Sequence, residues 1–86
     1  MMRLLLEIYL PAALRSFDVR VPADMRLSQA VPLISAALAQ MSGALYGADD
    51  TSVLCDRDSG EILNINMTVW ELGLRNGSRL MLISYM

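Results

Sequence analysis

The chain has 86 residues, of which seven are Lys or Arg and nine are Asp or Glu, and 55% are hydrophobic. A chain this short forms one domain, which we expect to span residues 1–86. Without histidine and with Cys55 as the single cysteine, one chain holds neither a Cys/His zinc site nor a disulfide framework, which indicates a reducing, cytoplasmic compartment. The basic residues, all arginines, are scattered and not gathered into a stripe, so nucleic acid is not an expected partner.

The first third of the chain predicts a β-hairpin. Residues 3–10 place leucine or isoleucine at every second position, and this period of two is typical of a strand. Pro11 ends the run, a short connection follows, and residues 17–21 alternate again until Pro22. Two alternating runs joined in this way favour two antiparallel strands.

From Leu27 the apolar period changes to threes and fours, which predicts a helix. The apolar positions of its buried face are Leu27, Ala30, Ile34, Leu38, Met41 and Leu45. Ser28 is the expected N-cap, which would place Pro32 in the first turn, and Gly43 is the expected end. Residues 27–48 carry no charge, but their serines, glutamines and glycines favour a helix of a globular domain over a membrane span.

The rest of the chain predicts a second strand-rich section. Residues 52–55 and 61–63 flank a turn-forming segment at 56–60, so a second hairpin is expected. Thr68 and Glu71 have the spacing of a capping box, which predicts one helical turn ending at Gly73. The pair at 76–77, Asn-Gly, is a turn signal, and residues 79–83 read as the final strand.

This order of elements in a chain of this length resembles the β-grasp, or ubiquitin-like, fold. The resemblance implies an α+β fold with a mixed sheet of four to five strands packed on one α-helix. More specific similarity lies in residues 17–24 (FDVRVPAD), in Leu27 with the helix entry 31–34 (VPLI), and in residues 70–80 (WELGLRNGSRL). These segments resemble the YukD/EsaB-like ubiquitin-like proteins of bacterial type VII (WXG-type) secretion systems, and equally the ubiquitin-like domain at the cytoplasmic start of the EccD membrane component. Protein components of a secretion machine are the partners that this resemblance implies.

Ubiquitins that are conjugated to other proteins end in a Gly-Gly tail, whereas this chain has no glycine after Gly77 and no lysine. We therefore expect a protein-interaction module that is not conjugated and that acts by docking. Two alternatives stay open: a ubiquitin-like sulfur carrier or modifier, and the excised cytoplasmic domain of an EccD-like membrane component.

The residues supply no catalytic set. Histidine and lysine are both absent, so no nucleophile can be paired with such a base, and Cys55 lies in an apolar strand where it is expected to be a packing residue. Asp56 and Asp58 resemble the opening of a calcium loop, but the rest of the loop is missing. Trp70 is expected to pack at one end of the sheet. We predict no enzyme activity, no cofactor, no metal site and no small-molecule substrate.

Strand alternation also predicts the core and two surfaces. The main core is expected from Leu6, Ile8, Phe17, Val19, Ile34, Leu38, Leu80 and Leu82. The opposite face of the helix carries small or neutral residues, Gln29, Ser35, Ala36, Ala39 and Gln40, and we expect it to pack on another chain, with a second copy as one candidate. If Leu80 and Leu82 face the helix, the apolar residues of opposite phase face outward. In the β-grasp sheet that the resemblance implies, the last strand lies between the first and the third. The predicted protein-interaction site is therefore a contiguous patch of Leu5, Leu54, Met81 and Ile83, rimmed by Arg3, Glu7 and Arg79.

Overall fold

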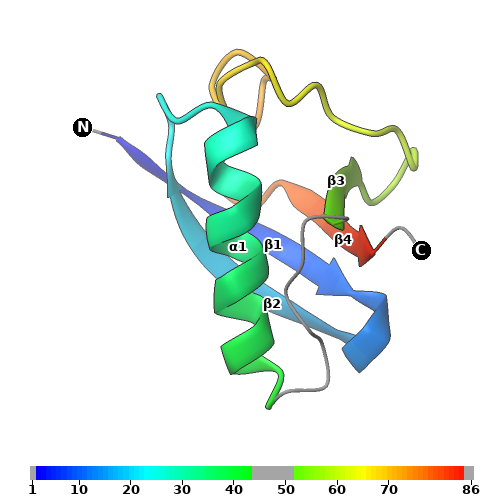
Figure 1. Ribbon diagram of the computed structural model, residues 1–86. Coiled ribbons are helices and arrows are strands. Elements are labelled where there is room, and N and C mark those ends of the chain that lie inside the picture. Colours follow the sequence, from blue (N-terminus) through cyan, green and yellow to red (C-terminus); the bar gives the residue numbers. More distant parts are fainter. Residues whose placement is uncertain (1, 44–51, 85–86) are drawn as a thin grey trace.

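The computed structural model describes residues 2–43 and 52–84, in which one α-helix lies across one face of a four-stranded sheet (Figure 1). The elements in chain order are β1 (Arg3–Leu10), a 3-10 turn (Pro11–Ala13), β2 (Arg15–Pro22), α1 (Leu27–Met41), β3 (Ser52–Asp56) and β4 (Arg79–Ser84). The strand order is β2-β1-β4-β3, with β1 and β4 parallel and the two outer pairs antiparallel. This mixed sheet on one helix confirms the predicted β-grasp architecture, including the central place of the last strand.

The β1–β2 hairpin forms as predicted, with eight residues of each strand in register from Arg3 opposite Pro22 to Leu10 opposite Arg15. The connection is wider than a two-residue turn because Pro11 begins a short 3-10 helix. Leu14 closes it in the left-handed conformation, at φ 53°, and its side chain is exposed.

The predicted start of the helix is wrong by two residues. Arg26, not Ser28, occupies the N-cap position, and it makes no side-chain capping bond. The N–H of Leu27 donates instead to the Met67 carbonyl and the N–H of Ser28 to the Ile65 carbonyl, so a neighbouring loop satisfies the groups that a cap would serve. Pro32 consequently lies inside the helix.

The predicted end of the helix is confirmed. Met41 is its last residue, Ser42 is the C-cap, and Gly43 follows with φ 67°, a left-handed conformation that glycine adopts at low cost. Met41 is 46% exposed and does not extend the buried stripe. Leu45, which was expected to continue that stripe, lies outside the described residues, as do Asp49 and Asp50.

The core lies between α1 and the facing side of the sheet. Of the eight residues predicted for it, seven are buried and Val19 is partly buried against it. Further buried members are Leu4, Leu10, Leu27, Leu54, Val69 and Leu74. Leu4, Leu6, Ile8 and Leu10 alternate on β1 as the period of two predicts.

The segment between β3 and β4 contains less regular structure than predicted. The expected hairpin is reduced to one isolated bridge, Cys55 with Ile62, supported by the Leu63 N–H donating to the Leu54 carbonyl. The capping box is confirmed: the Glu71 carboxylate accepts from the Thr68 N–H at 2.9 Å, and the Thr68 hydroxyl accepts from the Glu71 N–H at 3.1 Å. A single turn follows, in which the Leu72 N–H donates to the Thr68 carbonyl.

Candidate interaction surface on the outer face of the sheet

The face of the sheet that points away from α1 carries two different rows of side chains. Strand register places Glu7 beside Asp18 on β2 and beside Arg79 on β4. One step further along the sheet, Tyr9 lies beside Met81, and Met81 lies beside Cys55 of β3. We refer to the first as the charged row.

Ion pairs hold the charged row together. The Glu7 carboxylate lies 3.4 Å from a guanidinium nitrogen of Arg57 and 3.7 Å from one of Arg79, and Arg79 also approaches Asp58 at 3.9 Å. Arg57 follows β3 and crosses the sheet, since its guanidinium stacks on the Tyr9 ring at 4.4 Å and donates to the Ser16 hydroxyl at 3.2 Å. Exposed pairs of this kind contribute little one by one, but here one arginine connects three strands.

Next to the charged row lies an apolar surface, the outer-face patch, formed by Tyr9, Val53, Met81 and Ile83. Val53 is paired with Ile83 across β3 and β4, so the four side chains belong to three adjacent strands. All four are half-buried rather than fully exposed. Cys55 lies among them and is 2% exposed. A sheet face left uncovered by a helix is expected to be polar, and this part of it is not.

The structure brings together only two of the four residues predicted for the interaction site. Met81 and Ile83 lie in the outer-face patch, and Leu5 also faces outward but is separated from them by the charged row. Glu7 and Arg79, expected at the rim, therefore divide the surface instead of surrounding it. Leu54 was assigned to the wrong face: it is 2% exposed, is paired with Leu82 and belongs to the core under α1.

The error at Leu54 has a physical cause. Residues 53–55 are all apolar, so alternation within β3 does not define its phase. The polar residues on either side, Ser52 and Asp56, suggest that the even-numbered positions of β3 face solvent. The Ser52 hydroxyl lies in the interior instead, 3.5 Å from the Ser35 hydroxyl of α1. A buried serine pair thus reversed the apparent phase of β3 and concealed Val53, the residue that takes the place of Leu54 on the outer face.

Cys55 is not placed for chemistry. Burial raises the pKa of its thiol, so the reactive thiolate is disfavoured at neutral pH. Among residues 2–43 and 52–84, no three His, Cys, Asp or Glu side chains gather closely enough to hold a metal ion. The outer face thus presents an apolar part beside a charged part.

A family model described as the WXG100 protein secretion system (Wss) protein YukD matches residues 6–82. The chain belongs to the YukD family. Comparison with curated proteins gave no match.

Solved structures agree with a ubiquitin-like fold for this YukD-family chain. It is similar to the EccD5 ubiquitin-like domain from Mycobacterium xenopi, with a TM-score of 0.84, 18% identity, and coverage of 99% of this chain and 97% of that one. The ubiquitin-like domain of the Mycobacterium tuberculosis type VII secretion protein ECCD1 gives a TM-score of 0.76 at 19% identity, covering 98% and 100% of the two chains. A chain of the MycP5-free ESX-5 inner membrane complex matches with a TM-score of 0.79 at 15% identity, over all of this chain and 22% of that one.

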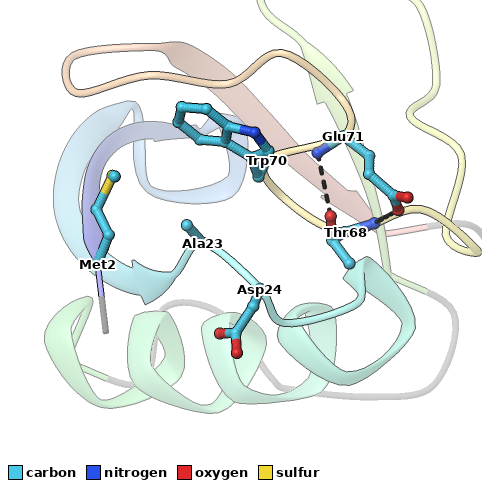
Figure 2. A pocket seen from close by; sticks show the side chains of 6 residues that line it. All are labelled: Met2, Ala23, Asp24, Thr68, Trp70 and Glu71. Atoms are coloured by element: carbon cyan, nitrogen blue, oxygen red, sulfur yellow. Dashed lines mark hydrogen bonds between the residues drawn. The ribbon is translucent and has the colours of Figure 1, made fainter.

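Away from the outer-face patch, this YukD-family chain has a hollow that is lined in part by Trp70, as Figure 2 shows. Its volume is about 340 Å³, and Met2, Ala23 and Asp24 line it together with the capping-box residues. The Trp70 indole is 54% exposed, so the expectation that this residue packs into the end of the sheet is wrong. Its backbone is anchored, because the Trp70 N–H donates to the Ala23 carbonyl at 2.9 Å. The Glu71 carboxylate is engaged with Thr68 and is not directed into the hollow (Figure 2).

The uncharged face of α1 is smaller than predicted. Ser35 is buried and lies against Ser52 of β3, and Ala39 is partly buried, whereas Gln29, Ala36 and Gln40 are exposed. Leu33, which was not assigned to this face, is 60% exposed. In the described part of the chain, no helix combines the length and the apolar character needed to cross a membrane.

Proposed function

We propose that this YukD-family chain is a non-catalytic, non-conjugated docking module of a bacterial type VII secretion system. In this role it works in the cytoplasm as an accessory component that binds protein partners of the secretion machine through the outer-face patch. The patch is the single observation that carries this proposal, because it places four partly exposed apolar side chains on a sheet face where polar residues are expected.

The charge pattern beside the patch adds orientation to such a contact. Arg57 and Arg79 flank the patch on one side and are held in place by Glu7. An apolar centre with a charged border on one side favours a partner whose own apolar residues are accompanied by carboxylates on the matching side. Because the guanidinium of Arg57 is already stacked on Tyr9, little side-chain freedom is lost when a partner binds there.

Secretion of a WXG100-type substrate tests the proposal in cells. We expect deletion of the gene to reduce secretion and the wild-type gene to restore it. The variant Met81→Asp should fail to restore secretion although the protein accumulates normally. The matched control is Ile65→Asp, which introduces the same charge at an apolar residue that is 53% exposed and lies away from the sheet. Full secretion with Met81→Asp would remove the outer-face patch from consideration.

A modifier or sulfur carrier would differ from a docking module in the mass of the protein isolated from cells. The intact mass of the protein isolated from its own cells, and of any higher-mass species recognised by an antibody against it, separates the two classes. A docking module is found at its unmodified mass in complexes that dissociate in denaturant. A thiocarboxylate or a covalent adduct that survives denaturant would favour the alternative.

A further inference from the structure

The two edges of the sheet are not equally protected. At the β3 edge, the segment after the strand supplies two backbone bonds, from the Asp56 N–H to the Glu61 carbonyl and from the Leu63 N–H to the Leu54 carbonyl. β2 is paired with β1 on one side, and on its other side no segment of residues 2–43 and 52–84 pairs with it. β2 is also the longer of the two, with eight residues against five. Long unpaired edges are templates for pairing with another strand.

The hydrogen-bond pattern identifies which groups are free on β2. The Ala23 N–H donates to the Met2 carbonyl at 2.9 Å, which marks this pair as a bonded pair of the antiparallel ladder. Bonded pairs recur every second residue, so the backbone N–H and C=O groups of Phe17, Val19 and Val21 point toward β1. The backbone N–H and C=O groups of Ser16, Asp18 and Arg20 are therefore directed away from the sheet, into solvent.

An apolar groove runs directly beside this edge. It has a volume of about 170 Å³ and lies between β2 and α1, with Val19 and Val21 on one wall and Leu33 and Ala37 on the other. Arg20 is the one charged residue among its lining, and α1 itself contributes no charge from Leu27 to Met41. Free backbone groups and an uncharged groove thus lie along the same edge.

We propose that the β2 edge is the contact between two copies of this chain, which pair their β2 strands antiparallel about a two-fold axis at Val19. Pairing Asp18 with Arg20 of the second copy, and Arg20 with its Asp18, satisfies both backbone groups of each of these residues. The Val19 side chains of the two copies meet on the helix side, where the two grooves join. The result is one continuous eight-stranded sheet with both helices on the same face.

Charge complementarity selects this register over its neighbours. A shift of the two-fold axis to residue 18 would oppose Asp18 to itself, and a shift to residue 20 would oppose Arg20 to itself, and like charges opposite each other destabilise a strand pair. In the proposed register both contacts are between opposite charges. Neither side chain forms an ion pair within the described residues, and Asp18 lies beside the like charge of Glu7 on the neighbouring strand β1. Both are thus available to a second copy.

Charge reversal provides a test that separates this contact from general effects of charge. Sedimentation velocity of the full chain at rising concentration should show a monomer–dimer equilibrium. Asp18→Arg and Arg20→Asp should each weaken dimerisation by about tenfold or more, since each replaces two attractive contacts by two repulsive ones. The double variant, which keeps the net charge of the wild type, should dimerise again. An equimolar mixture of the two single variants should form a heterodimer, because every contact is then between opposite charges.

Hydrogen exchange reports on the backbone of the same contact. As concentration rises, the amides of Ser16, Asp18 and Arg20 should become protected, whereas those of Phe17 and Val19 should be protected throughout. A wild-type chain that stays monomeric at millimolar concentration would overturn the proposal, as would dimerisation of Asp18→Arg at the wild-type affinity. Protection that appears only when an extended peptide of another protein is added would also overturn it.

Discussion

The two faces of the sheet show how one set of strands serves two purposes. On the side of α1, each strand presents leucine, isoleucine, phenylalanine or valine, and residues such as Leu6, Ile8 and Leu80 are completely buried. On the outer side, the same strands present the charged row and the outer-face patch, whose members are only partly covered. Most of the burial that stabilises the fold therefore lies on one face, and the other face presents partly exposed apolar and charged side chains.

The largest expected effect comes from placing the same charge on the two faces of β3. We expect Leu54→Asp to prevent folding, because an unpaired carboxylate would be buried beneath α1. Val53→Asp should leave the chain folded, since that side chain is on the outer face. Circular dichroism and amide NMR spectra distinguish the two results. If both variants fold equally well, the assignment of Leu54 to the core is wrong.

The next largest effect is a difference in stability between truncations of two adjacent residues of β4, Leu82 and Ile83. Leu82→Ala removes a completely buried side chain and should cost about 2 to 5 kcal/mol of the free energy of unfolding. Ile83→Ala removes a half-buried one and should cost about 1 kcal/mol. Urea denaturation of both variants measures the difference. Equal losses would show that the outer face contributes to stability as much as the core does.

A smaller effect concerns the arginine that crosses the outer face. Arg57→Ala should lower the free energy of unfolding by about 1 kcal/mol at low salt, because its contacts with Glu7 and the Tyr9 ring are lost. Added salt should reduce the ion-pair part of this loss. Arg75→Ala is the matched control, since it removes the same charge from an exposed side chain outside the charged row. A loss that is the same for both variants would argue against a specific role of Arg57.

The smallest effect is on the pH dependence of stability. The Ser59 N–H donates to the Asp56 carboxylate at 2.8 Å and lowers the pKa of that group. The folded state then binds fewer protons than the unfolded state, so this contribution is present above the ordinary aspartate pKa of about 4 and is lost as the pH falls through the lower folded value. Asp56→Asn should flatten the acid limb of a stability–pH curve slightly. An unchanged acid limb would contradict this assignment.

Local patterns in the sequence were sufficient for most of the fold. The alternation of β1, the change of period at Leu27 and the glycine at 43 each depend on neighbours in the chain, and all three predictions were confirmed. The capping box of Thr68 and Glu71 was predicted from spacing alone because its two hydrogen bonds join residues three apart. The core followed from the same periodicities, because a side chain's face is determined by its position in a strand or helix.

The arrangement of side chains on the outer face depended on contacts between distant segments, and here sequence patterns were insufficient. The start of α1 was missed because loop carbonyls at 65 and 67 replace a side-chain cap. The phase of β3 was missed because Ser52 is satisfied inside by Ser35, seventeen residues away. The division of the outer face arose because Arg79 of β4 and Arg57, which follows β3, both reach Glu7 of β1. Local patterns thus specify which elements form and where apolar side chains lie along the chain. Which of these side chains share a surface depends on strand register and on polar partners remote in the chain, and these are set when the elements pack together.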